Sequence, residues 1–245
     1  MAITATIDWC EPNYAVVPYI AEFWNTLSSV VMVLLGACGI TFAAWVKCPK
    51  FCATQFAFLA LVGVGSTLFH ATLDIYAQML DEIPMMWHTL AIIEFNRSLL
   101  RGTYRDAILP SWPFIAWGAL LSVIHAKFQF VLVFQVHFIV ITLYSIVQMA
   151  QLAARHPMYA HMARMQLLVA SMGAIAWLMD HHRIHCDTLY LHAWWHVLVG
   201  FATFAGLCMT TDIALRLKFT HEGPRAINPR GYYMVSEIDI RPSIE

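Results

Sequence analysis

Charged residues are scarce in this sequence, and their scarcity excludes a large water-soluble core. Asp, Glu, Lys and Arg make up 12% of the 245 residues, against roughly a quarter in an ordinary soluble domain. Hydrophobic residues make up 60% and come in successive runs of about 18 to 25, each long enough to cross the hydrocarbon core of a bilayer as a helix. The formal net charge of -1 gives no indication of a nucleic-acid partner. The composition therefore predicts a polytopic membrane protein.

The amino-terminal segment lacks the features of a cleavable signal peptide. Its opening residues, MAITATIDWCEP, have neither a basic start nor an apolar stretch, so we expect the first hydrophobic helix to direct the chain to the membrane. Pro84, Pro110 and Pro113 are expected in the first turns of their helices. The predicted fold class is all-α, a seven-transmembrane helix bundle with helices at about residues 21–46, 54–73, 79–96, 107–124, 129–154, 163–180 and 192–217.

The basic residues indicate how this bundle is oriented. An odd number of spans places the two termini on opposite sides of the membrane, and loops rich in Lys and Arg face the cytosol. Most of the 14 basic residues fall on one side, whereas the other side holds only Lys127 and Arg183. We therefore expect a lumenal amino terminus, a membrane domain over residues 1–218 and a cytosolic tail over residues 219–245.

The cysteines divide according to the same predicted topology. Of the six cysteines, four lie in a cytosolic loop or within spans. Only Cys10 and Cys186 share the oxidising side, where a disulfide is stable. The sequence pattern leaves open whether these two thiols meet.

Ionisable residues at membrane depth are costly, so they are candidates for a functional site. Ser66 and His70 are four residues apart in GVGSTLFHATLD, which places both on one face of the second helix. Asp81 opens the predicted third helix in LDEIPMMW. His192 and His196 repeat the four-residue spacing in HAWWHVLVG, at the start of the seventh helix.

The predicted topology brings these residues to one leaflet. The second helix ends there, and the third and seventh begin there. Three histidines plus a water molecule form a typical catalytic zinc site. The alternative is that each histidine only hydrogen-bonds a neighbouring helix, and a single His-x-x-x-His does not exclude it.

The amino-terminal segment offers a second set of candidate ligands. Its oxygen-bearing side chains are closely spaced, which suits calcium, although a solvated polar terminus is the simpler interpretation of the residues alone. These side chains are Asp8, Glu11, Asn13 and Glu22.

Taken together, these motifs resemble the alkaline ceramidase family. The resemblance runs from DWCEPNY and IAEFWNT through GSTLFHATL and LDEIPMMW to WLMD and HAWWHVLVG, and it covers nearly the whole membrane portion. The motifs occur in the family's order at compatible separations. The wider superfamily also contains adiponectin-receptor-like proteins with seven helices.

The resemblance implies an intramembrane zinc-dependent amidase. Such an enzyme cleaves ceramide, dihydroceramide or phytoceramide to a sphingoid base and a free fatty acid. His70, His192 and His196 match the family's zinc ligands, and Asp81 and Ser66 match its other catalytic positions.

The resemblance also implies features outside the zinc site. Cys10 and Cys186 match a disulfide pair, and the endoplasmic reticulum or Golgi is the expected location. Residues 8–22 correspond to a calcium-binding segment. Its ligands match the side chains of Asp8, Glu11, Asn13 and Glu22 and the backbone carbonyl of Trp9.

One departure and one rival interpretation accompany the resemblance. The run DHHRIHCDTLYLH is rich in histidine, so His182 or His185 is a possible competitor for metal. The rival is a lipid-sensing receptor with seven helices and a structural zinc, and a transporter with a histidine-lined path is a further alternative. The sequence gives no indication of a protein partner.

Overall fold

A computed structural model describes residues 4–184 and 189–222 of the chain. Within these ranges the protein consists of helices and contains no strand, which confirms the predicted all-α class. The helices are α1 (Phe23–Trp45), α2 (Lys50–Thr72), α3 (Ile75–Leu100), α4 (Trp112–Phe128), α5 (Val131–Arg155), the short 3-10 helix η1 (Pro157–Tyr159), α6 (Ala160–His181) and α7 (Leu191–Glu222). Because α7 continues to Glu222, it includes the first residues of the predicted tail.

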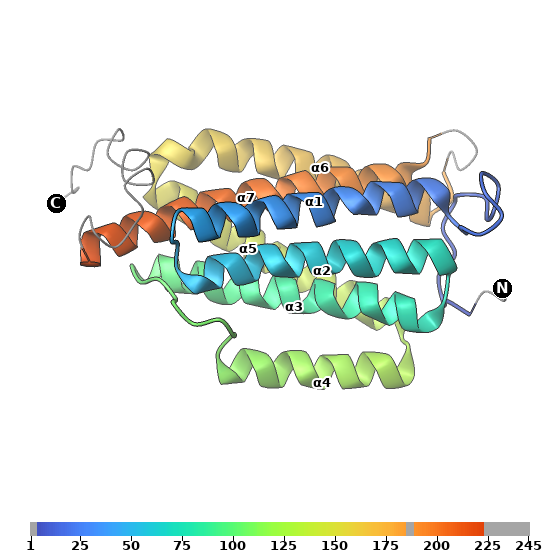
Figure 1. Ribbon diagram of the computed structural model, residues 1–245, viewed down its shortest axis with the longest axis horizontal. Helices are drawn as coiled ribbons and strands as arrows, with labels where there is room; N and C mark the ends of the chain where they lie inside the picture. Colours follow the sequence, from blue (N-terminus) through green and yellow to red (C-terminus); the bar gives the residue numbers. More distant parts are fainter. Residues whose placement is uncertain (1–3, 185–188, 223–245) are drawn as a thin grey trace.

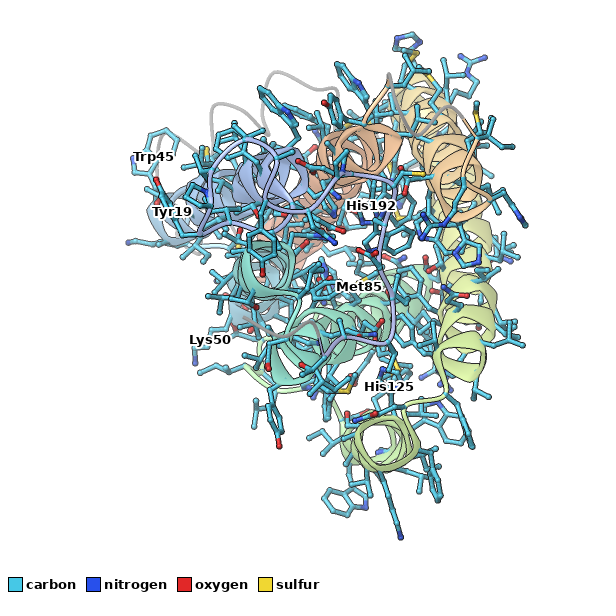
Figure 2. The ribbon with its side chains drawn as sticks, turned by 90° about the vertical axis from the view of Figure 1, so that its right-hand side faces the viewer. Tyr19, Trp45, Lys50, Met85, His125 and His192 are labelled. Carbon is cyan, nitrogen blue, oxygen red and sulfur yellow. The ribbon has the colours of Figure 1, made fainter. Side chains whose placement is uncertain are left out.

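The α-helices run side by side along the long axis of the molecule (Figure 1). Six of them form a closed ring in which α1 contacts α2, α2 contacts α3, α3 contacts α5, α5 contacts α6, α6 contacts α7, and α7 returns to α1. The remaining helix, α4, packs mainly on α3 and lies at the edge of the bundle (Figure 2). Side chains of the ring helices, among them α3 and α7, fill its interior, whereas α4 lies outside the ring.

Five of the helices are long and apolar enough to cross a membrane: α1, α2, α5, α7, and the segment of η1 with α6. The two others differ for separate reasons. α4 has only 17 residues, and α3 is too polar, because it carries carboxylates, amides and a histidine. Most of these polar side chains of α3 are buried inside the bundle, including Gln78, Asp81, Glu82, His88, Glu94 and Asn96.

The third helix begins earlier than the sequence pattern predicts. Asp74 caps it, because its carboxylate accepts hydrogen bonds from the backbone N–H groups of Tyr76 and Ala77, at 2.8 and 3.4 Å. Asp81 therefore lies in the second turn of α3 and does not open it. Polar residues near the start of α3 interrupt the apolar pattern in the sequence, and neighbouring helices bury them.

The prediction that Pro84 lies in a first turn is wrong, because Pro84 is in the interior of α3. Proline has no backbone N–H, so the Leu80 carbonyl has no helical donor. That carbonyl faces Gly65 of α2, where a Cβ atom would lie 1.9 Å from its oxygen. Interior prolines are tolerated in membrane proteins because neighbouring helices compensate for the lost hydrogen bond. Here Gly65 has no side chain, so α2 and α3 can approach closely.

The apolar core is concentrated at the end of the bundle where α2 begins and α3 and α7 approach their ends. Phe51, Phe95, Leu152, Met209 and Ile213 form its buried centre. Towards the other end of α2 lie buried polar residues, among them Ser66 and His70. This large apolar cluster and His70 thus lie towards opposite ends of the bundle.

Candidate metal centre

Three histidines come together at the end of the bundle where α2 ends and α7 begins. His70 lies in the last turn of α2, and His192 and His196 lie in the first turns of α7. One ring nitrogen of each lies within 4.8 Å of those of the other two, and all three side chains are buried. Helices far apart in the sequence thus place three imidazoles around one point, as the topology argument predicted.

The nitrogen atoms of this cluster fit a metal ion. Within the described residues, Nε2 of His70 and Nδ1 of His192 are buried and have no hydrogen-bond partner. Buried polar atoms in folded proteins are nearly always paired, so an unpaired nitrogen facing two further imidazoles indicates a missing partner. Neutral imidazole donors suit zinc and related transition metals. The cluster can therefore hold one metal ion.

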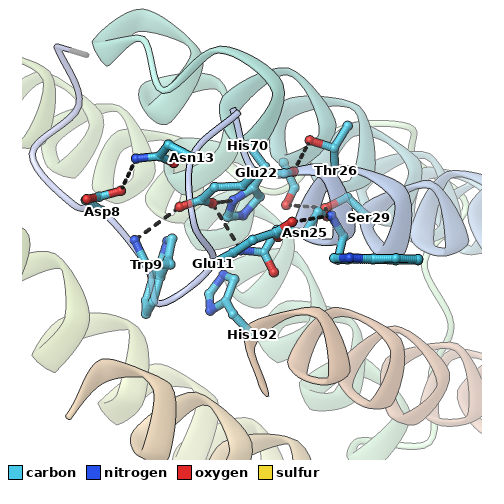
Figure 3. Close-up of polar contacts among 12 residues, drawn as sticks. Asp8, Trp9, Glu11, Asn13, Glu22, Asn25, Thr26, Ser29, His70 and His192 are labelled. Carbon is cyan, nitrogen blue, oxygen red and sulfur yellow. Dashed lines mark hydrogen bonds and ion pairs between the residues drawn. The ribbon is translucent and has the colours of Figure 1, made fainter. Parts of the chain in front are cut away.

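Glu22 orients the first of these histidines (Figure 3). Its carboxylate is fully buried and lies 2.5 Å from Nδ1 of His70. It also accepts hydrogen bonds from the backbone N–H of Trp9 and the side-chain amide of Asn25, at 3.1 and 3.0 Å. Burial raises the pKa of Glu22 to about 7, while the bonds from Asn25 and Trp9 lower it. A donor at Nδ1 leaves Nε2 of His70 with a lone pair for a metal, the usual arrangement of a ligand histidine and its carboxylate.

The other two histidines are held differently. Nδ1 of His196 lies 2.9 Å from Oγ of Ser28 and 3.2 Å from Oγ of Ser29. The ring of His192 stacks on Trp9, with the centroids 3.7 Å apart and an interplanar angle of 23°. Each ring is thus fixed by a separate contact from α1 or from the segment before it.

Asp180 joins the amino-terminal segment to the start of α7. Its carboxylate accepts hydrogen bonds from the backbone N–H groups of Cys10 and His192, at 3.2 and 3.3 Å. The sequence interpretation assigned no role to this residue, although WLMD was among the motifs of the resemblance. An aspartate at the end of a hydrophobic run was the only available signal.

The two other predicted catalytic residues lie on α2 and α3. Oγ of Ser66 is 3.4 Å from Nε2 of His196 and 2.9 Å from Oγ of Ser29. Asp81 is buried, and its backbone nitrogen is 2.8 Å from where a Cβ of Gly65 would lie. The close approach at Gly65 therefore places Asp81 at the level of Ser66.

The predicted calcium ligands gather around the start of α1. Asp8 accepts a hydrogen bond from the side-chain amide of Asn13, at 3.0 Å, while Oδ1 of Asn13 is buried without a partner in the described residues. Glu11 accepts hydrogen bonds from the backbone N–H groups of Trp24 and Asn25, at 2.6 and 2.9 Å, and thereby caps α1. Burial raises the pKa of Glu11, and these backbone bonds oppose the shift.

One further histidine that the sequence offered as a possible competitor for metal, His182, does not enter the histidine cluster. His182 is exposed and lies outside the group of potential ligands. His185 and Cys186 lie outside the described residues, so the pairing of Cys10 with Cys186 stays a prediction.

A second buried histidine–glutamate pair lies elsewhere in the bundle. Nε2 of His125 on α4 is 2.5 Å from Oε2 of Glu82 on α3, and Figure 2 shows His125 at the inner side of α4. His125 thus makes a contact from helix to helix. The sequence analysis did not single out this pair, because its members are 43 residues apart in the chain.

Sequence comparisons with known proteins match most of the chain. The family model described as Ceramidase matches residues 1–228. An alkaline ceramidase of Arabidopsis thaliana is 30% identical over 242 residues, which cover 95% of this chain and 90% of the relative. An alkaline ceramidase of Saccharomyces cerevisiae is 32% identical, with 82% of this chain and 74% of the relative covered. Alkaline ceramidase 3 of Mus musculus is 27% identical, with 82% and 80% covered.

Proposed function

Because the chain belongs to the ceramidase family, we propose that it is an intramembrane zinc-dependent amidase that hydrolyses ceramide-type sphingolipids to a sphingoid base and a free fatty acid. The observation that carries the proposal is the buried cluster of His70, His192 and His196, in which two ring nitrogens, Nε2 of His70 and Nδ1 of His192, have no hydrogen-bond partner among the described residues. The names of its relatives supply the substrate class. The bilayer supplies the lipid.

Zinc bound by the three histidines would polarise the amide carbonyl and lower the pKa of a bound water. Asp81 would act as the general base, accepting a proton from the attacking water and delivering it to the leaving amine. Ser66 would either donate a hydrogen bond to the developing oxyanion or hold the water. Its position beside Nε2 of His196 supports both roles.

We extend the proposal to the membrane arrangement. All seven helices over residues 1–218 would cross the bilayer, with the polar side chains of α3 shielded either inside the ring or against α4 and the connection that precedes it. The amino terminus and the histidine cluster would face the lumen of the endoplasmic reticulum or Golgi. Residues 219–245 would be cytosolic, and Cys10 would pair with Cys186 on the lumenal side.

A calcium ion would hold the segment over residues 8–22. The buried, unpaired Oδ1 of Asn13 supports a cation there, together with the carboxylates of Asp8, Glu11 and Glu22 and the backbone carbonyl of Trp9. In this arrangement the calcium ion would help to fix Trp9, which stacks on His192. Calcium would therefore affect the zinc site indirectly, by holding Trp9 against His192.

The deciding experiment measures amide hydrolysis and metal content on the same samples. Purified protein is incubated with ceramide labelled in its fatty acid, before and after chelation and with zinc restored. We expect release of labelled fatty acid that is lost on chelation and returns with zinc. Zinc-loaded protein that binds ceramide without releasing fatty acid would instead support the lipid-sensing receptor.

A further inference from the structure

Two consecutive serines of α1 meet the histidine cluster, but they do not make the same contacts. Both hydroxyl oxygens lie near Nδ1 of His196, at 2.9 Å for Ser28 and 3.2 Å for Ser29. Of these two serines, only Ser29 also lies within hydrogen-bonding distance of Ser66, at 2.9 Å between the hydroxyl oxygens. Ser29 therefore connects a candidate metal ligand with a candidate catalytic residue.

We assign the hydrogen atoms of this network from the Asn25 carbonyl, which can only accept. The hydroxyls of Ser28 and Ser29 lie 3.0 and 2.8 Å from its oxygen, so we assign both as donors to it. A hydroxyl has one hydrogen, so both oxygens act as acceptors towards their other neighbours. Nδ1 of His196 then carries the hydrogen that it shares with them, and its Nε2 has a free lone pair. A histidine that binds a metal through Nε2 requires this tautomer.

The same assignment fixes the direction of the contact between Ser29 and Ser66. The hydrogen of Ser29 is directed at Asn25, so the hydroxyl of Ser66 is the donor in its bond to Ser29. The Ser66 hydrogen then points away from the histidines, and its oxygen lone pairs face them. The two roles left open for Ser66 require opposite directions of its hydrogen.

We infer that Ser29 is a positioning residue that keeps Ser66 as a hydrogen-bond acceptor towards the histidine cluster. This inference rests on the proposed function and deepens it. Ser66 holds the attacking water by accepting one of its hydrogens, while the water oxygen stays free to attack. Ser28 orients His196 alone, so it provides a matched control on the same helix turn.

The test uses the purified full chain with Ser28→Ala, Ser29→Ala, Ser66→Ala and their double variants. We expect Ser29→Ala to lower kcat roughly 3- to 10-fold, the effect of one hydrogen bond, with KM changed less than about 2-fold. In the Ser66→Ala background the same change should lower kcat less than about 2-fold. Ser28→Ala should lower kcat by the same small factor with or without Ser66. Equal effects of the two serines, each independent of Ser66, would overturn the inference.

Zinc affinity, measured by competition with a chelator, gives a readout apart from turnover. Each single serine variant should leave zinc affinity within about 3-fold, because the other serine still accepts the His196 hydrogen. The Ser28→Ala/Ser29→Ala variant should lose roughly 10- to 100-fold, as expected for the partner of a ligand histidine. If the parent binds zinc but does not cleave ceramide, the proposed function fails. In that case unchanged zinc affinity in the double variant would overturn the assigned hydrogen-bond directions as well.

Discussion

Two histidine–glutamate pairs are buried in this bundle, and the distance between the imidazole nitrogen and the carboxylate oxygen is the same in both. Nδ1 of His70 lies 2.5 Å from Oε2 of Glu22, and Nε2 of His125 lies 2.5 Å from Oε2 of Glu82. All four residues are at most 5% exposed. The pairs differ in what surrounds the imidazole.

The remaining nitrogen of His70 faces two other histidines, so the Glu22 carboxylate orients a candidate metal ligand. His125 instead stacks on Phe134, with the ring centroids 4.9 Å apart. It is one of two buried residues of α4, the other being Gly118. Its pair with Glu82 therefore fastens a peripheral helix to α3. A buried carboxylate beside a histidine does not by itself identify a metal site; the neighbours of the second nitrogen decide.

The largest difference between the two pairs should appear when the histidines are removed. Loss of one of three ligands leaves a metal with too few protein donors, so His70→Ala should release most of the zinc and abolish ceramide hydrolysis. His125→Ala should retain about one zinc per protein. Metal content by mass spectrometry, measured beside fatty-acid release, checks both variants. Retention of zinc by His70→Ala would remove this histidine from the metal centre.

Asp81 is the general base of the proposed mechanism, whereas Glu82, the next residue, belongs to the pair with His125. Asp81→Asn keeps the shape of the side chain but removes the base. It should therefore retain zinc while turnover falls by roughly 10²- to 10⁴-fold. Glu82→Gln, one residue away, serves as the control and should leave turnover within about 10-fold. If Asp81→Asn loses zinc as completely as His70→Ala, Asp81 is a ligand and not the base.

Much of this architecture could be predicted from hydrophobic runs and residue spacing. The seven helices follow from apolar runs, and the histidine cluster follows from i, i+4 spacing combined with an odd number of spans. The start of α3 did not, because its polar residues are sheltered by other helices and reduce the apolar signal. The interior position of Pro84 could not be predicted either, since an interior proline is tolerated only where surrounding helices compensate for the lost hydrogen bond, and the sequence does not show those neighbours.

The support of the site was less accessible to sequence reasoning than its ligands. Ser28 and Ser29 are ordinary small residues in an apolar run, and their contact with His196 joins positions more than 160 residues apart. Glu11 was predicted only as a calcium ligand, whereas it also caps α1. Pairings between distant helices depend on their rotation about their own axes, which a single sequence does not specify.

Substituting the carboxylates of the two pairs should produce a smaller difference in zinc binding than substituting the histidines. Glu22→Gln keeps the size of the side chain but weakens the hold on His70, so zinc affinity should fall roughly 10- to 100-fold. Glu82→Gln should leave zinc affinity unchanged. Chelator competition at saturating and at depleted calcium checks this prediction. A loss in Glu22→Gln that disappears when calcium is depleted would show that Glu22 acts through calcium alone.

The smallest effect on activity, but a clear effect on stability, is expected when the Glu82–His125 pair is broken. Removing one partner of a buried ion pair leaves the other uncompensated, at a cost of about 3–5 kcal/mol. Glu82 also accepts a hydrogen bond from Gln78, which accepts one from the backbone N–H of Thr6, so its loss should also loosen the amino-terminal segment. Glu82→Met should therefore lower the thermal stability in detergent.

The Glu82→Met/His125→Leu variant should recover much of that loss, because apolar side chains of similar size can replace a buried ion pair at little cost. Both variants should keep zinc, since neither change touches the histidine cluster. The melting temperatures of the parent, the two single variants and the double variant form a complete cycle. If the double variant is as unstable as the sum of the singles, α4 is not fastened by this pair. The resemblance between the two histidine–glutamate pairs would then be limited to their distance.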